Sequence, residues 1–381
     1  MNVRATSMKM SHALANGLPP VASLRQDFHC HKLCKGEQNL PFMVTNVKLT
    51  QEGQEHYWGY HSNSAEDEFK YFKNVRYCPD AGAFYAYRIY GQLISKEQFK
   101  TEVDAFMASS PMYDHVLFNI HGFNVNPEPS FLGAQEFNRD HGPETGYFVI
   151  PINWRNVWGM NFPSYEYDRN TYAIQAGKSL AAQVDMFQLS AKTSILCHSM
   201  GNYVFRVMAQ ETGNPEQVFE NVFMVAADAR MDMFSTEFNP DAPGASESIG
   251  ATNVFDAHTS YADIPAEELR KNGGLAITEL TNHVHVAWNL GDHALLGREV
   301  FQIGFGDTVR KALGKYGGQA EALTTLPYFT ERVTYHDMSK VIEEFGIEHN
   351  YQWSSPLITM YEECKPKETN SMLFERHFKV D

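Results

Sequence analysis

Short apolar runs alternate with amphipathic stretches over most of the chain from residue 115 onwards. The runs of mainly apolar residues cover 115–120, 147–154, 194–197, 221–228 and 283–288. A continuous apolar run of this length is typical of a parallel strand that is buried on both faces. Strands that alternate with helices predict an α/β fold, with a mostly parallel, doubly wound sheet and helices on both of its faces.

The pattern also predicts elements outside this central region. Strands are predicted over 41–47, 84–90 and 332–336, and helices over 96–109, 172–189 and 339–345. We expect the charged stretch over 66–73 to be solvated and the Pro-, Gly- and Ser-containing stretch over 234–252 to be a mobile loop. The expected organisation is an irregular extension (1–40), one domain with insertions (41–363) and a polar tail (364–381).

A serine lies at the junction between one predicted strand and the helix that follows it. Ser199 comes directly after the apolar run 194–197 and one further residue, and Val204 and Val207 recur beyond it at helical spacing. A strand, a sharp turn that carries a serine, and a helix form the nucleophile elbow of the α/β-hydrolases. The tight turn needs small neighbours, and Gly201 is one of them. The alternative is a buried serine at an ordinary strand-to-helix turn.

A second loop follows the strand predicted over 115–120, which ends in His121, Gly122 and Phe123. In α/β-hydrolases the loop after the corresponding strand, often beginning His-Gly, provides one backbone N–H of the oxyanion hole. Gly122 has no side chain, so the backbone at this point can approach a substrate oxygen closely. The sequence therefore predicts an oxyanion loop here.

A nucleophilic serine needs a histidine as general base and a carboxylate that holds this histidine. In this fold the acid follows a strand after the elbow, and the histidine follows the last strand. Asp292 ends the second strand after the elbow and is favoured over the alternative acid, Asp228, which ends the first. His349 lies beyond the last strand and is favoured over His336, which lies within it. We expect His198 to pack beside the nucleophile or support it.

Four segments resemble the motifs of a known family. They are His-Gly-Phe-Asn-Val at 121–125, Cys-His-Ser-Met-Gly-Asn at 197–202, Asp-His-Ala-Leu at 292–295 and His-Asn-Tyr at 349–351. In the same order, they resemble the motifs of an α/β-hydrolase family of unknown function. The chain departs from the family's pattern at Cys197, where alanine is usual, at Gly291, where asparagine precedes the acid, and at Asn350, where serine is usual.

The resemblance implies the α/β-hydrolase fold and a role for each candidate residue. It implies Ser199 as the nucleophile, Asp292 as the acid and His349 as the base. It also implies the backbone N–H groups of Phe123 and Met200 as oxyanion donors. The family is described by its fold, so the resemblance does not name a substrate.

Charge and composition narrow the classes of partner. The chain of 381 residues has 31 Lys and Arg against 46 Asp and Glu, which gives a formal net charge of −15. This charge argues against electrostatic binding of nucleic acid or of an anionic membrane surface. No stretch approaches about 18 continuous apolar residues, and the five cysteines indicate no disulfide framework. We therefore expect a cytoplasmic protein without an integral membrane segment; a short transit peptide within 1–18 is the alternative.

Two histidines and two cysteines lie close together near the N-terminus, at His29, Cys30, His31 and Cys34. Their spacing suits no common four-ligand zinc site, and no second ligand pair lies nearby in the sequence. We expect an extended segment here in preference to a metal-binding module. The sequence thus predicts neither a metal site nor an organic cofactor.

The expected function is a serine hydrolase that cleaves a small-molecule or lipid carboxylic ester through a Ser-His-Asp triad and an acyl-enzyme intermediate. Amide or thioester hydrolysis and acyl transfer are alternatives on the same triad. An alternative of another class is a non-catalytic scaffold used for binding, because a fold does not by itself guarantee a function. The aromatic-rich residues 155–170 would line an acyl pocket or act as a lid, or else pack on the domain as a surface loop.

Overall fold

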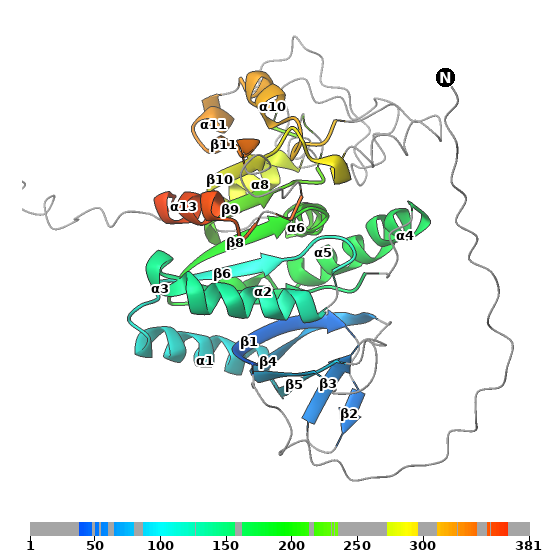
Figure 1. The fold of residues 1–381 in the computed structure, drawn as a ribbon, viewed down its shortest axis with the longest axis vertical. Helices are drawn as coiled ribbons and strands as arrows, with labels where there is room; N and C mark the ends of the chain where they lie inside the picture. The colour runs from blue at the N-terminus through cyan, green and yellow to red at the C-terminus, as the bar shows by residue number, and fades with distance from the viewer. Residues whose placement is uncertain are drawn as a thin grey trace, which may run out of the picture. The chain divides into compact units, whose positions relative to one another are not determined.

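An 11-stranded sheet forms the framework of the protein (Figure 1). Its strands are β1 (Gln38–Val47), β2 (Thr50–Glu52), β3 (Glu55–Gly59), β4 (Ala65–Pro79), β5 (Tyr87–Ile94), β6 (His115–Ile120), β7 (Tyr147–Asn153), β8 (Lys192–His198), β9 (Phe219–Val225), β10 (Thr281–Trp288) and β11 (Val333–Asp337). They lie in the order β11-β10-β9-β8-β6-β7-β1-β4-β5-β3-β2. The computed structural model describes residues 38–47, 50–52, 55–59, 65–79, 87–125, 127–156, 162–212, 217–229, 231, 233–234, 273–295, 311–325, 327–340, 349–350 and 352–364.

The sheet is mixed but mostly parallel. Every neighbouring pair from β11 to β1 is parallel, whereas the pairs from β1 to β2 are antiparallel. The chain passes from β6 to β7 on one side and then to β8 on the other, so the strand order reverses at β6. The predicted fold class, an α/β protein with a mostly parallel, doubly wound sheet, is confirmed.

Alternate residues of the central strands face two hydrophobic cores. In β6, Val116, Phe118 and Ile120 belong to one core and Leu117 to the other. Helices α1 (Lys96–Ser109), α5 (Ile174–Ala181), α6 (Gly201–Glu211) and α8 (Gly274–Leu280) contribute to the first core, and α2 (Pro127–Asp140) and α13 (Ser355–Glu363) to the second. Helices therefore cover both faces, and β6 is buried throughout, as its continuous apolar run predicts.

Helix α1 has the bounds that its apolar spacing predicts. The Ser95 hydroxyl caps it by accepting a hydrogen bond from the Gln98 N–H at 3.2 Å. Such a cap satisfies one of the N–H groups that the first turn leaves without an intrahelical partner. Phe99 and Val103 are fully buried on its inner face.

The charged stretch over 66–73 belongs to strand β4, and the expectation that it is solvated is wrong for its aromatic residues. Phe69, Tyr71 and Phe72 are buried there, while Lys73 forms an ion pair with Glu102 of α1. Charged and aromatic residues are interleaved, so the aromatic side chains enter the core while Glu68 remains exposed and Lys70 and Lys73 remain partly exposed.

Other bounds also differ from the predictions. Strand β5 begins at Tyr87, and the helix predicted over 172–189 is divided into a π-helix, η2 (Asp168–Ala173), then α5, then a 3-10 helix, η3 (Val184–Phe187). Strand β1 begins at Gln38, within the expected extension 1–40. The rest of that extension, most of the loop 234–252, residues 341–345 and the tail beyond 364 lie outside the described residues.

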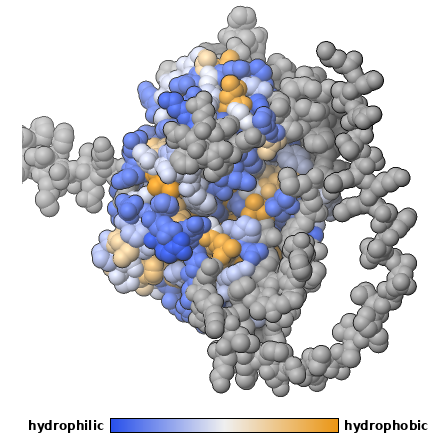
Figure 2. Space-filling view, viewed as in Figure 1, coloured by the Kyte–Doolittle hydropathy of each residue, from blue (hydrophilic) through white to orange (hydrophobic). Residues whose placement is uncertain are grey.

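The described surface is mostly hydrophilic on the face drawn in Figure 2, where the hydrophobic residues form small separate patches. The large apolar residues exposed over the described ranges are Leu93, Met112, Tyr167 and Leu290. Among the helices of the described part of the chain, none has the length and hydropathy needed to cross a membrane.

Candidate active site

The candidate residues follow parallel strands at one edge of the sheet. Ile120, at the end of β6, pairs with Cys197 near the end of β8, and His198 pairs with Val225 at the end of β9. Trp288, at the end of β10, pairs with Asp337 at the end of β11. Because parallel strands end at the same edge, the loops that follow them converge there, as ligand-binding loops do in open α/β sheets.

Ser199 lies at a sharp turn between β8 and α6. Its φ angle is 51°, in the left-handed region that non-glycine residues rarely adopt. Its N–H donates to the Val225 carbonyl at 3.0 Å, and its own carbonyl accepts from the Asp228 N–H at 3.2 Å. Ser199 is 8% exposed. The loop after β9 thus holds the serine in the strained conformation that is typical of a nucleophile elbow.

Two glycines allow the loop after β6 to pack directly on this turn. A Cβ atom added at Gly122 would lie 2.7 Å from the Ser199 Cβ and 3.1 Å from the His198 Nδ1. A Cβ atom added at Gly201 would lie 2.4 Å from the Ile120 carbonyl oxygen. The distances of 2.7 Å and 2.4 Å are too short for real Cβ contacts, so only glycine permits this approach at either position. The predicted oxyanion loop and the elbow are therefore in contact.

His121 fixes the orientation of the first peptide in the oxyanion loop. Its Nε2 accepts from the Trp154 N–H at 3.3 Å, and its Nδ1 donates to the Gly122 carbonyl at 2.9 Å. Burial lowers the pKa of His121 to about 4, so the ring is neutral. In a trans peptide the C=O and the N–H point in opposite directions. The N–H of Phe123, in the same peptide, therefore points away from His121.

Met200 begins the helix that follows the serine. It is fully buried and occupies the N-cap position of α6. The backbone N–H groups at a helix N-terminus have no intrahelical acceptor and carry the positive end of the helix dipole. This environment favours a negatively charged oxygen beside Met200, which is what an oxyanion donor requires.

Asp292 and His349 form a partly buried pair, although they lie 57 positions apart in the sequence. The Nδ1 of His349 lies 2.7 Å from the Oδ2 of Asp292, whose side chain is fully buried, while the His349 side chain is 19% exposed. The other carboxylate oxygen accepts from the Leu295 N–H at 3.0 Å. Lys315 Nζ donates to the Asp292 carbonyl at 3.2 Å. The acid is thus held on several sides and presents one oxygen to the histidine.

His198 connects this pair to the elbow. Its Nε2 donates to the backbone carbonyl of His349 at 3.0 Å, and the two ring centroids lie 4.9 Å apart. Burial, together with the nearby His349, lowers the pKa of His198 to about 3. The ring of His198 therefore stays neutral and acts as a fixed donor. Through it, the residue directly before Ser199 holds the backbone of His349.

The alternative candidates have other partners. Asp228 is buried, and its carboxylate accepts a hydrogen bond from the hydroxyl of Tyr165. The ring of Tyr165 also packs edge-to-face on Phe123, with centroids 5.4 Å apart. His336 lies on the face of the sheet, with its Nε2 3.2 Å from the Nδ1 of His285. The structure thus pairs His349 with Asp292 and places Asp228 next to the elbow backbone.

The hydrogen bonds of three supporting residues were not predicted, although His198 was expected to pack beside the nucleophile or support it. The hydrogen bonds of His121 and His198 depend on which ring nitrogen carries the proton, and the motifs His-Gly and His-Ser do not reveal this. Asn202, which is fully buried, donates from Nδ2 to the carbonyls of Cys197 at 2.9 Å and Ser199 at 3.0 Å. The only signal for it in the sequence is its place in the resemblance over 197–202.

The aromatic-rich segment over 155–170 is helical where it is described. Helix α4 (Phe162–Tyr167) leads into η2, in which Asp168 and Arg169 are buried. The guanidinium of Arg169 lies over the ring of Tyr203, 4.5 Å from its centroid. Residues 157–161, like the His and Cys residues at 29–34, lie outside the described residues.

Several solved structures are distantly similar to this chain. A lipase-esterase related protein from Clostridium acetobutylicum is 11% identical over 66% of this chain and 94% of its own, with a TM-score of 0.30. A thermostable carboxyl esterase from Bacillus coagulans is 10% identical over 85% of this chain and 96% of its own, with a TM-score of 0.32. One structure from a study of two metagenome-derived lipolytic enzymes, LipS and LipT, is 16% identical over 61% of this chain and 89% of its own, with a TM-score of 0.30.

No curated protein matches the sequence. The sequence model of a family described as alpha/beta hydrolase of unknown function (DUF900) matches residues 95–363. This range covers most of the chain and contains all the candidate residues, from Phe123 to His349. The resemblance stated above from four short segments is thereby confirmed, and the protein belongs to this family of α/β-hydrolases of unknown function.

Proposed function

We propose that the protein is a serine hydrolase that cleaves carboxylic esters with Ser199, His349 and Asp292. The observation that carries this proposal is the pairing of His349 with the buried Asp292 at 2.7 Å, next to a serine in the left-handed conformation. A carboxylate in this position orients the histidine and stabilises its protonated form. His198 supports the proposal because it holds the histidine backbone next to the elbow.

In the proposed reaction, the Oγ of Ser199 attacks the ester carbonyl carbon while the Nε2 of His349 takes its proton. The carbonyl π electrons move to the oxygen and give a tetrahedral oxyanion. When this intermediate collapses, the bond to the alcohol oxygen breaks, and the alcohol leaves with the proton from His349. Water, activated by His349, then attacks the acyl-enzyme and releases the carboxylic acid, which restores Ser199.

The backbone N–H groups of Phe123 and Met200 would hold the oxyanion. Loss of one such donor typically raises the barrier by about 3 kcal/mol. The donors have to be rigid to be effective, because a fixed dipole needs no reorganisation as charge develops. The contact of Gly122 with the elbow and the hydrogen bond from His121 to the Gly122 carbonyl support such a role.

The substrate class is proposed as a small-molecule or lipid ester. Phe123 and Tyr165 place two aromatic rings in edge-to-face contact next to the oxyanion loop. Apolar walls of this kind favour an ester with an apolar acyl or alcohol part. Amide or thioester hydrolysis and acyl transfer would use the same three residues, and a panel of substrates distinguishes them. A scaffold that only binds its ligand would lack an activated serine.

The test is covalent labelling of the full-length protein with a fluorophosphonate probe, which reacts with an activated serine. We expect the wild-type protein to be labelled and the Ser199→Ala variant to remain unlabelled. Ser194→Ala is the matched control, because Ser194 is also buried in β8 and has no proposed role. Labelling of Ser199→Ala, or no labelling of the folded wild type, would contradict the proposal. Turnover of p-nitrophenyl esters of increasing acyl length would then define the acyl group.

A further inference from the structure

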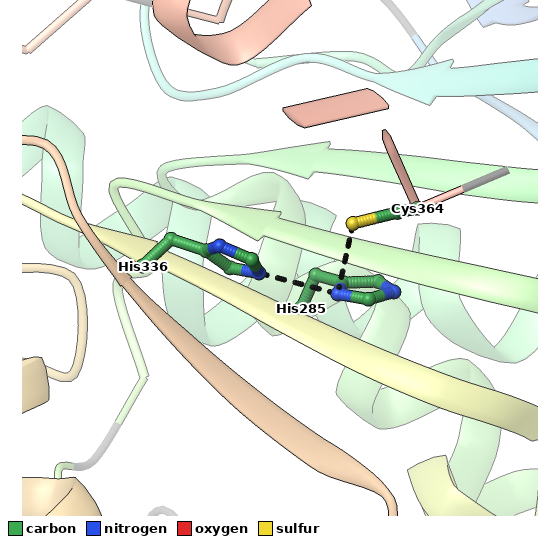
Figure 3. A group of neighbouring side chains, drawn as sticks. All are labelled: His285, His336 and Cys364. Carbon is green, nitrogen blue, oxygen red and sulfur yellow. Dashed lines mark hydrogen bonds between the residues drawn. The ribbon is translucent and has the colours of Figure 1, made fainter. Parts of the chain in front are cut away.

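Three side chains that can ligate a metal converge on the sheet face beneath α13, and none of them belongs to the candidate triad. His285 comes from β10, His336 from β11 and Cys364 from the residue that follows α13. Figure 3 shows the two imidazoles and the sulfur pointing toward one another. Over the residues that the structure describes, no other group of three such ligands lies within 4.8 Å.

The distances between these atoms fit one metal ion. The His285 Nδ1 lies 3.2 Å from the His336 Nε2 and 3.4 Å from the Cys364 Sγ. A tetrahedral zinc ion, with bonds of about 2.0 Å to nitrogen and about 2.3 Å to sulfur, places two nitrogens about 3.3 Å apart and a nitrogen about 3.5 Å from the sulfur. The two distances from His285 are therefore close to the separations that a shared ion requires, and the His336 and Cys364 ligand atoms lie within 4.8 Å of each other.

Asn221 of β9 fixes the tautomer of His285 that leaves its Nδ1 free to bind a metal ion. The Nδ2 of Asn221 donates to the Cys364 carbonyl at 3.3 Å, so its Oδ1 faces the His285 Nε2 at 3.1 Å. The Nε2 of His285 therefore carries the proton, and the Nδ1 has a free lone pair. Metal-ligating histidines usually donate their second N–H to an outer partner in this way. The ring of Phe223 stacks on His285, with centroids 5.2 Å apart, and holds its plane.

Hydrogen bonds alone do not account for the way these three side chains meet. An imidazole nitrogen without a proton offers one lone pair, yet the His336 Nε2 and the Cys364 Sγ both approach the Nδ1 of His285. Only one of them can donate to it at a time. An ion placed between the three atoms would instead accept a lone pair from each of them.

We propose that His285, His336 and Cys364 bind a borderline-soft divalent metal ion of the zinc class, with a fourth coordination position open to water. Two imidazoles and a thiolate are a donor set that zinc prefers over the oxygen-binding ions Mg²⁺ and Ca²⁺. Binding releases the thiol proton of Cys364 to water and moves the proton of His336 from Nε2 to Nδ1. The step involves no oxidation or reduction.

The ion would act as a clip for the segment that carries His349. His336 lies at the end of β11 and Cys364 directly after α13, so the ion closes the chain on both sides of the segment 337–363. Closing a segment in this way lowers the entropy of the unfolded chain and so stabilises the folded state. This site is independent of the proposed ester hydrolysis, because it shares no residue with the proposed triad.

The experiment measures cobalt and zinc binding to the full-length protein in a Cys30→Ser/Cys34→Ser background, which removes the other candidate ligand pair. We expect one equivalent of Co²⁺, with the near-ultraviolet charge-transfer band of a cobalt–thiolate bond, and competition by one equivalent of Zn²⁺. Cys364→Ser should abolish the band. Asn221→Ala, which keeps all three ligands, should weaken affinity by about 10- to 100-fold.

His336→Gln provides a second test of the ligand set, because His336 is only partly buried and its loss should leave the fold intact. The matched control is His283→Gln, an exposed histidine on the same strand as His285, which should bind as tightly as the parent. The proposal is overturned if the parent shows no stoichiometric band, if the band survives in folded Cys364→Ser, or if folded His336→Gln binds Co²⁺ as tightly as the parent. The proposal would also be overturned if the wild-type protein binds the metal but the Cys30→Ser/Cys34→Ser protein does not.

Discussion

The ring of His198 donates a hydrogen bond to the backbone carbonyl of His349, 3.0 Å away. The residue directly before the proposed nucleophile thus holds the main chain of the proposed base. Serine and histidine are far apart in the sequence, and a single neutral donor joins the elbow to the loop that carries His349. Burial lowers the pKa of His198 to about 3, so this donor does not change its charge over the pH range in which such an enzyme works.

Replacing His198 should therefore impair the proposed reaction without removing a reacting group. His198→Leu keeps the apolar volume but loses the donor, and we expect kcat/KM for an ester to fall by about 10- to 100-fold, since a misplacement of about 1 Å has such an effect. His198→Gln, whose Nε2 replaces the donor, should recover most of the activity. The pH profile should keep its shape in both variants, since His198 stays neutral. A shifted profile would contradict a positioning role.

The two candidate acids provide a matched comparison, because both are buried and both follow a strand of the parallel part of the sheet. Asp292→Asn should lower kcat by about 10⁴-fold, since the amide cannot hold His349 in the tautomer that accepts the serine proton. Asp228→Asn should lower it by less than about 10-fold, because Asp228 bonds to Tyr165 and not to His349. Steady-state ester hydrolysis by the two variants is the measurement. The reverse order would reassign the acid.

Gly122→Ala should disable the site through backbone displacement. The added Cβ would overlap the Ser199 Cβ at 2.7 Å, so the oxyanion loop has to move away from the elbow. We expect a loss of stability of about 1–3 kcal/mol and at least about a 100-fold loss of kcat/KM. Gly318→Ala, in an exposed helical position whose nearest neighbours are atoms of the Trp288 ring at 3.2 Å, is the control and should keep its activity. Equal activity of both variants would contradict the contact.

His121 should make stability depend on pH in the acidic range. Its pKa is 6.5 in a model peptide and about 4 in the folded protein, where burial lowers it. Above pH 6.5 the ring is neutral in both states and contributes nothing to the pH dependence. As the pH falls from 6.5 toward 4, only the unfolded chain takes up the proton, so the free energy of unfolding decreases by up to about 1.4 kcal/mol per pH unit.

Denaturant unfolding at pH 7 and pH 5 tests this expectation. In His121→Asn, whose side-chain amide can replace the Nδ1 donor, the decrease in unfolding free energy between the two pH values should be smaller by about 2 kcal/mol than in the wild type. His141→Asn, at a half-buried histidine, is the control and should behave like the wild type. An unchanged decrease in His121→Asn would show that another group is responsible.

The sequence predicted the elements whose residue pattern is determined by burial. Strands β6, β7 and β8 are buried on both faces, so their apolar runs are unambiguous, and α1 has both a cap and helical spacing. Strand β4 was missed because charged residues interrupt its apolar ones, and only pairing with β1 and β5 shows that it is a strand. The breaks between η2, α5 and η3 depend on tertiary packing, which helix propensity does not encode.

In the candidate site, too, some features could be predicted from the sequence and others depend on tertiary packing. The order of Ser199, Asp292 and His349 along the chain was available from the sequence, because the fold prescribes where each residue follows a strand. The contacts of His121 and His198 depend on which ring nitrogen carries the proton and which carbonyl it faces. The cluster of His285, His336 and Cys364 joins three elements that only the packing of α13 on the sheet brings together.

The left-handed backbone conformation of Ser199 lowers the stability of the folded protein. A residue other than glycine in the left-handed region is strained by about 1–2 kcal/mol. Glycine would adopt the same φ of 51° without this penalty, so a chain selected only to fold would have glycine at position 199. The free energy of unfolding of a folded protein is typically about 5–15 kcal/mol, and part of it is lost here because position 199 carries a hydroxyl group. Such a sacrifice is expected where a side chain has to act on a molecule other than the protein itself.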